Sequence, residues 1–166
     1  MRSIPKQAFG YVVFVTECDA GEERTVDLTN DGYNLSGHYF YTKGRVKNYV
    51  IETGEQLEDR VAGWLNTEHP EGNASTSGTV QDIYIEDSQW LCIPHRYNDN
   101  KLPTLQSLIL ESEQSQILPN GTDLYLVRGK LNINGKLFVG PTQIRVRSGD
   151  VTAISIDDTS YSLKFL

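Results

Sequence analysis

Short apolar runs and alternating apolar and polar residues occupy most of this chain, and both patterns are typical of β-strands. Residues 11–15 form a continuous apolar run of strand length, which predicts a strand buried on both faces. Residues 35–42 place Tyr39 and Tyr41 on one face and His38 and Phe40 on the other. Similar segments follow at residues 46–52, 80–86, 90–93 and 105–110. The pattern therefore predicts an all-β protein.

The last third of the chain gives the clearest strand signals. Asn134-Gly135 separates two short alternating segments, and this dipeptide favours a two-residue hairpin turn, which needs positive φ angles at both positions. Residues 144–147, 151–156 and 161–165 alternate in the same way and are separated by turn residues. Strands at this spacing are typical of a β-sandwich, or jelly roll.

One segment has a helical rather than a strand period. Leu57, Val61, Trp64 and Leu65 are spaced as one face of an α-helix. Thr53 precedes this stripe at a position suited to capping the first turn. We therefore expect one short amphipathic helix near residues 54–66.

The polar stretches suggest how the chain is divided. Residues 67–79 contain almost no apolar side chains, which predicts a surface loop. No internal sequence repeat is evident. We expect a single β domain over residues 1–166. The alternative is an N-terminal sheet plus helix, residues 1–66, packed on a jelly roll of residues 80–166.

Composition excludes several classes of protein. The chain has 166 residues, 15 basic and 22 acidic ones, and a hydrophobic fraction of 38%. It is too apolar for a disordered protein, and its apolar runs are too short for a membrane helix. A net charge of −7 argues against general nucleic-acid binding. With Pro5 interrupting any secretion signal, we expect a soluble protein located in the cytoplasm or in a virion.

The segment from residue 120 to residue 166 resembles a cupin, a small jelly-roll barrel. The resemblance rests on GTDLYLVRGKLNINGK, which ends a first block at Gly129, and on RVRSGDVTAI, which opens a second block at Gly149-Asp150. It implies a jelly-roll fold. The metal ligands of the family are missing: its Glu would fall at Thr122, next to Asp123, and no histidine follows residue 95. The resemblance therefore implies a cupin-like barrel without the usual metal site, and we expect no cofactor.

Other candidate chemistry is sparse. His69 and Glu71, with His95, have residue types suited to an iron site, but the first two fall in the predicted polar loop, so this remains a minor alternative. Neither a nucleophile elbow nor a phosphate-binding loop is present. Cys18 and Cys92 are expected to be buried thiols. We therefore assign no catalytic residue.

Tyrosines and arginines are the candidates for binding. Tyr39 and Tyr41 could form an exposed contact surface, although strand tyrosines more often line a core. Arg128, Arg145 and Arg147 lie in a slightly basic end of the chain: residues 117–166 hold 6 basic and 4 acidic residues, against 9 and 18 in residues 1–116. Such a row could contact an acidic surface on a neighbouring copy.

These observations give two functional hypotheses. The first is a non-enzymatic assembly protein, such as an oligomeric structural component of a phage virion, whose partners are copies of itself or another protein. The alternative is a metal-independent cupin that binds or isomerises a small polar ligand, for example a sugar derivative. Its site would lie in the barrel mouth, lined by Tyr125, Arg128, Arg145 and Tyr161. A polar, open barrel interior would favour the alternative, and an interior filled with aliphatic side chains would argue against it.

Overall fold

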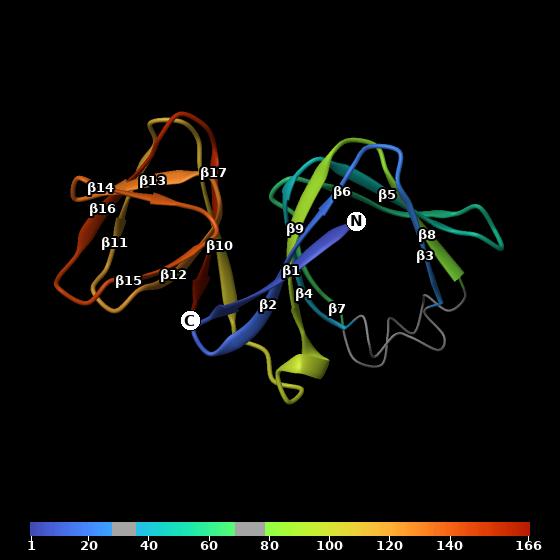
Figure 1. Ribbon diagram of the computed structural model, residues 1–166, viewed down its shortest axis with the longest axis horizontal. Coiled ribbons are helices and arrows are strands. Elements are labelled where there is room, and N and C mark those ends of the chain that lie inside the picture. The colour runs from blue at the N-terminus through green and yellow to red at the C-terminus, as the bar shows by residue number, and fades with distance from the viewer. Residues whose placement is uncertain (28–35, 69–78) are drawn as a thin grey trace. The chain divides into compact units, whose positions relative to one another are not determined.

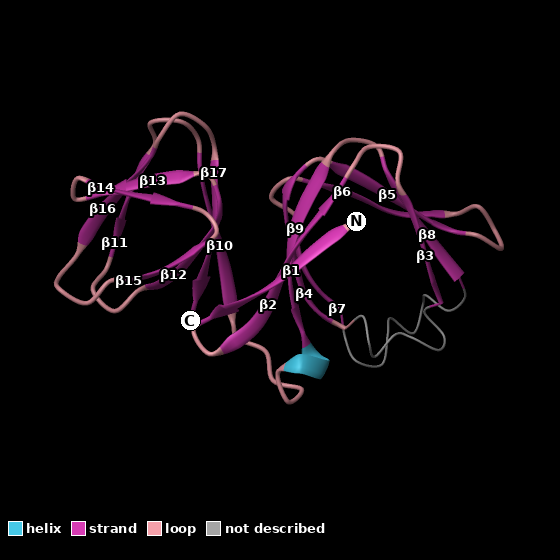
Figure 2. Ribbon diagram, in the orientation of Figure 1, coloured by secondary structure: helices cyan, strands magenta, loops and turns pink. Residues whose placement is uncertain are grey.

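The computed structural model describes residues 1–27, 36–68 and 79–166. The chain divides into two compact units, Met1–Leu102 and Pro103–Leu166 (Figure 1). Strands dominate both units, and the only helix within the described residues is one short 3-10 turn (Figure 2). The expectation of an all-β fold is confirmed.

The first unit contains two antiparallel sheets. One is five-stranded with the order β1-β2-β9-β4-β7, and the other is four-stranded with the order β3-β8-β5-β6. The strands and the 3-10 turn are β1 (Arg2–Ala8), β2 (Tyr11–Cys18), β3 (Glu23–Asp27), β4 (Gly37–Lys43), β5 (Arg45–Val50), β6 (Gln56–Val61), β7 (Leu65–Glu68), β8 (Thr79–Tyr84), β9 (Ser88–Pro94) and η1 (His95–Tyr97).

The second unit contains two four-stranded antiparallel sheets, with the orders β10-β17-β12-β15 and β11-β16-β13-β14. Its strands are β10 (Leu105–Leu110), β11 (Ser115–Leu118), β12 (Asp123–Arg128), β13 (Lys130–Ile133), β14 (Lys136–Val139), β15 (Thr142–Arg145), β16 (Val151–Ser155) and β17 (Ser160–Phe165). The β13–β14 hairpin turns at Asn134-Gly135, where φ is 51° and 84°, as the sequence predicts. The Asn132 side chain accepts a hydrogen bond from the amide of Gly135 at 2.9 Å.

The two units share one strand topology. Strand β4 leads through Gly44 into β5, and β12 leads through Gly129 into β13, while β9 and β17 occupy the equivalent central positions in their sheets. Both glycines have positive φ, 89° and 103°. A Cβ atom on Gly44 would lie 2.3 Å from the Ser88 hydroxyl oxygen, and one on Gly129 would lie 2.8 Å from the Ser160 Cα. The structure therefore contains an internal repeat that the sequence does not show.

The predicted helix near residues 54–66 is wrong. Residues 56–61 pair with β5 and residues 65–68 pair with β4. The apolar stripe does not face a core as a helix would require, because Val61 is 49% exposed while the neighbouring Arg60 is inserted beside the Trp64 ring. Gly63, with φ 95°, turns the chain between the two strands. Sheet pairing has overridden the helical spacing.

The two compact units meet at a boundary that the sequence does not indicate. This boundary lies at Leu102–Pro103, and the expectations of one domain over residues 1–166 or of a division near residue 66 stay predictions. Strand β9 pairs with both β2 and β4. The first unit therefore contains strands from before and after residue 66. Of the predicted loop 67–79, residues 69–78 lie outside the described residues, Thr67 and Glu68 belong to β7, and Thr79 begins β8.

Candidate functional site

The interior of the second unit is filled with aliphatic side chains. Its core consists of Leu108, Leu110, Leu118, Leu124, Leu126, Leu131, Ile133, Ile144, Val146 and Ala153, with Phe138 and Val151 packed against it. Every one of these positions is apolar. Apolar side chains dominate this interior, and the buried polar side chains of the unit are the small serines Ser155, Ser160 and Ser162. By the criterion set out from the sequence, an interior filled in this way argues against a ligand site.

The interior of the first unit is aromatic and polar. The buried Trp90 ring lies near Tyr84 and Tyr41, with ring centroids 5.5 Å and 5.3 Å away. Arg60 reaches into the same cluster and donates a hydrogen bond to the Tyr41 hydroxyl at 3.3 Å. Buried polar groups thus accompany the aromatic rings inside this barrel.

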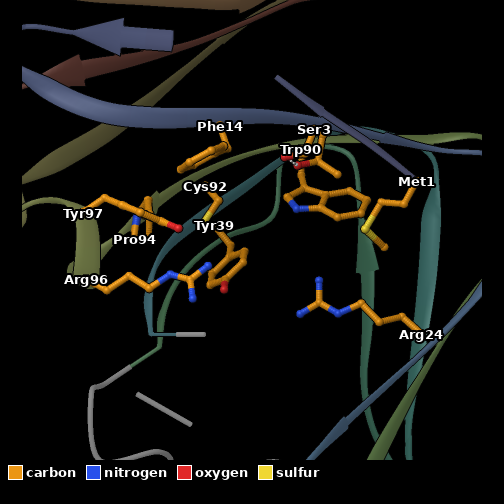
Figure 3. Close-up of a pocket in the computed structure, with 11 residues that line it drawn as sticks. Met1, Ser3, Phe14, Arg24, Tyr39, Trp90, Cys92, Pro94, Arg96 and Tyr97 are labelled. Atoms are coloured by element: carbon orange, nitrogen blue, oxygen red, sulfur yellow. Dashed lines mark hydrogen bonds between the residues drawn. The ribbon is translucent and has the colours of Figure 1, made fainter. Parts of the chain in front are cut away.

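An open cavity of about 210 Å³ adjoins this aromatic cluster. Figure 3 shows its side chains, which come from five strands, from the 3-10 turn and from Met1, the residue before β1. The lining residues are Met1, Ser3, Phe14, Thr16, Arg24, Tyr39, Trp90, Cys92, Pro94, Arg96 and Tyr97.

Strand alternation explains why these residues meet. Trp90 and Cys92 are two positions apart on β9, so their side chains share a face, and Cys92 pairs with Phe14 of β2 and with Tyr39 of β4. Arg24 belongs to β3 of the other sheet, so both sheets of the unit contribute to the cavity. Both sheets of the unit therefore line the cavity, which opens to solvent at the exposed Arg96 and Tyr97.

The cavity is positively charged within an acidic unit. Residues 1–102 hold 9 basic and 16 acidic residues, yet the described lining contains Arg24 and Arg96 and no carboxylate side chain. Arg96 lies over the ring of Tyr97, with 4.7 Å between its guanidinium carbon and the ring centroid. The half-buried Arg24 makes no hydrogen bond or ion pair with any described residue. Asp82, which faces it across β3 and β8, instead accepts a 2.6 Å hydrogen bond from Asn48.

The positive charge of the arginines acts to lower the pKa values of the neighbouring Tyr39 and Cys92. Burial raises the pKa of Tyr39 well above its usual value, and the Arg24 charge opposes that rise. Burial also raises the pKa of the Cys92 thiol to about 11, against the opposing effects of a hydrogen bond from Tyr39 and the charges of Arg24 and Arg96. The cavity wall thus holds neutral phenol and thiol groups beside two arginines that form no ion pair with a described carboxylate.

The residues of the minor iron hypothesis are only partly described. His69 and Glu71 lie outside the described residues. His95 is buried in η1, and its Nδ1 has no hydrogen-bond partner among the described residues. No group of three or more His, Cys, Asp or Glu side chains in the described part of the chain is arranged to hold a metal ion. We therefore derive no chemistry through a metal here.

The predicted barrel-mouth residues of the second unit differ in their solvent exposure. Tyr125 is buried, on the opposite face of β12 from the core residues Leu124 and Leu126. Arg128 and Tyr161 are half-buried register partners, and Arg145 is exposed. Their role as a ligand site stays a prediction.

The predicted contact residues also fall in different settings. Tyr41 is buried in the aromatic cluster of the first unit, whereas Tyr39 lines the cavity. Arg147 is exposed and forms an ion pair with Asp123. Sequence reasoning thus found Tyr39 but missed Arg24, Trp90 and Arg96, because nothing in the local pattern separates them from ordinary strand and turn residues.

Comparison with known proteins shows the fold. No protein-family model and no curated protein sequence matches the chain. Among solved structures, YhaK from Escherichia coli has a TM-score of 0.54 at 12% identity, over 99% of this chain and 93% of that one. YhhW from Escherichia coli has a TM-score of 0.50 at 12% identity, over 93% and 80%. A cupin 2 conserved barrel domain protein from Leptotrichia buccalis has a TM-score of 0.44 at 10% identity, over 99% and 88%.

The chain has a cupin-like jelly-roll fold. The resemblance read from residues 120–166 is thereby confirmed for the fold. The main functional hypothesis, an oligomeric virion component, is wrong, since the fold is that of YhaK and YhhW and nothing in these similarities indicates a virion protein. No helix of the described residues is long and apolar enough to cross a membrane.

Proposed function

We propose that this protein binds a small polar ligand in the cavity of residues 1–102. The observation that carries the proposal is the contrast between two barrels of one topology. One is filled by aliphatic side chains, and the other keeps a cavity lined by arginine, tyrosine and tryptophan. A barrel that served only as a scaffold would not need to leave such groups around an open space.

The composition of the cavity fits ligand recognition. Small-molecule sites are concave and mostly apolar, with a few polar groups that fix the orientation of the ligand. Here the rings of Phe14, Tyr39 and Trp90 supply the apolar walls, and the guanidinium groups of Arg24 and Arg96 supply the polar ones. At about 210 Å³, the cavity is smaller than the roughly 300–1,000 Å³ of sites for drug-sized molecules, which favours a ligand with a single ring.

A fragment screen tests this proposal. We would record ligand-observed NMR spectra of a library of neutral, anionic and cationic fragments with the wild-type protein. The comparison protein is Ser3→Phe, which fills the cavity from β1. Because neighbouring strand residues face opposite sides, Ile4→Phe adds the same ring on the other face of β1 and serves as the matched control.

The proposal expects fragments that bind the wild-type protein and Ile4→Phe and that lose binding to Ser3→Phe. It is overturned if no fragment binds, or if every fragment that binds does so equally well to Ser3→Phe. Circular dichroism of the two variants verifies that both retain the strand content of the wild-type protein.

A further inference from the structure

Resting on this proposed function, we propose that the ligand is a small planar carboxylate: an aromatic or conjugated carboxylic acid whose charged group binds Arg24 and whose flat skeleton lies against the aromatic wall. This class differs from the sugar derivative offered as an example from the sequence. Three features of the described lining carry the inference: its hydrogen-bonding groups, its positive charge and its aromatic walls.

The cavity side chains donate hydrogen bonds but offer few acceptors. The described lining includes two arginines, two tyrosines and a tryptophan, but contains no Asp, Glu, Asn, Gln or His. Arginine and the indole N–H are donors only. The hydroxyls of Ser3 and Thr16 are hydrogen bonded to each other at 2.8 Å. Sugar hydroxyls need acceptors as well as donors, so this lining instead suits a ligand that is mainly an acceptor.

The charge on Arg24 points to an anion. The half-buried Arg24 guanidinium has no hydrogen bond or ion pair with a described residue, and an anionic ligand would offset the desolvation cost of such a group. Figure 3 shows the Arg24 side chain extending toward Tyr39 and Trp90, while the Arg96 side chain enters the lining from the 3-10 turn. A carboxylate matches the planar fork of a guanidinium with two parallel hydrogen bonds.

The remaining wall favours a flat apolar skeleton over a bare anion. Phe14 and Tyr97 lie with ring centroids 5.4 Å apart and an interplanar angle of 51°, and Tyr39 and Trp90 continue the aromatic lining. Inorganic phosphate or a sugar phosphate would leave these rings without an apolar partner. A planar ring beside the carboxylate would cover them, and aromatic pairs of this kind are favourable beyond the area that they bury.

Isothermal titration calorimetry with matched small molecules tests the inference. Benzoate is the planar anion, benzamide is its neutral counterpart, and cyclohexanecarboxylate keeps the charge without the flat ring. Inorganic phosphate and glucose 1-phosphate represent anions without an aromatic skeleton. Each is titrated into wild-type protein, Arg24→Met, Arg24→Lys and Lys43→Met. Lys43 is exposed and does not line the cavity, so Lys43→Met is the control for an equal change in net charge.

We expect benzoate to bind at least tenfold more tightly than benzamide and more tightly than cyclohexanecarboxylate. Loss of a charge-assisted hydrogen bond should weaken benzoate binding to Arg24→Met about tenfold to a hundredfold. Arg24→Lys should retain part of the affinity, and Lys43→Met should bind within about twofold of the wild type. Lower ionic strength should strengthen benzoate binding.

Two results overturn the planar carboxylate while leaving the proposed function intact. Benzamide could bind as tightly as benzoate, which would assign a neutral aromatic ligand. The phosphates could bind in an Arg24-dependent manner while benzoate does not, which would assign a different anion. Absence of binding by the whole set also overturns the inference, and the fragment screen separately decides whether the cavity binds other molecules.

Discussion

The Trp90 indole is stacked on the Tyr84 ring, with centroids 5.5 Å apart and planes 8° from parallel. Trp90 comes from the central strand β9, and Tyr84 ends β8 of the opposite sheet. The pair therefore bridges the two sheets of the first unit beside the cavity. A ring fixed in this way gives the cavity a rigid wall. Binding a ligand then costs less conformational entropy, because this side chain is already ordered.

The Tyr84 hydroxyl gives a direct test of this packing. It is buried and has no hydrogen-bond partner in the described part of the chain. Tyr84→Phe removes the unsatisfied hydroxyl and keeps the stacked ring, so we expect the free energy of unfolding to stay the same or to rise by up to about 1 kcal/mol. Urea denaturation followed by tryptophan fluorescence measures it, because both tryptophans lie in this unit. A loss of more than about 1 kcal/mol would show that the hydroxyl has a partner.

The glycines between paired strands test the internal repeat. Gly44→Ala and Gly129→Ala each place a Cβ within 3 Å of another strand at a positive φ, and each should lower stability by at least about 2 kcal/mol. Gly10→Ala and Gly149→Ala are matched controls, because their Cβ atoms would meet nothing within 4 Å, so only the backbone strain of about 1–2 kcal/mol remains.

Hydrogen exchange of backbone amides measures the effect in each unit. We expect Gly44→Ala to reduce protection in residues 1–102 and Gly129→Ala to reduce it in residues 103–166. Equal protection in the test variants and in their controls would contradict an equivalent role for the two glycines.

The Cys92 thiol gives a pH-dependent test of the cavity. Because burial raises its pKa to about 11, the thiol is protonated at neutral pH, and only about one molecule in a thousand is a thiolate at pH 8. Alkylation by iodoacetamide should therefore accelerate about tenfold per pH unit from pH 7 to pH 10. Peptide mass spectrometry follows Cys92 separately from Cys18. A rate that levels off near pH 8.5 would mean that the thiol is not shifted.

Ligand occupancy should also protect Cys92, since this residue lines the cavity. A fragment that binds in the cavity is expected to slow alkylation of Cys92 in proportion to the occupied fraction. Cys18 does not line the cavity and serves as the internal control. Unchanged alkylation of Cys92 at saturating fragment would place the binding site elsewhere.

The parts of the fold that depend on local chemistry could be predicted from the sequence. The Asn134-Gly135 hairpin is an example, because positive φ angles at two adjacent residues restrict which side chains can form the turn. The segment around Arg60 could not be predicted in this way. Its helical spacing is real, but pairing with β5 and the contact of Arg60 with Trp64 decide the structure.

The cavity depends on pairings that are distant in the sequence. Arg24 meets Trp90 and Tyr39 because separate strand pairings bring β3, β4 and β9 into one barrel. No local pattern marks Arg24 as different from any other charged strand residue. The sequence resembles a cupin only in the second unit, whose interior is filled. The cavity lies in the first unit, which has the same strand topology but no such resemblance in its sequence.

The central claim is that the barrel of residues 1–102 binds a small ligand while that of residues 103–166 is a filled core. Amide NMR spectra of the uniformly labelled protein, recorded during a titration with benzoate, test it most directly. We predict saturable shifts at Arg24, Tyr39 and Cys92, with the amides of Leu131 and Ala153 unchanged. Saturable shifts at Leu131 and Ala153, with the cavity amides unchanged, would contradict the claim.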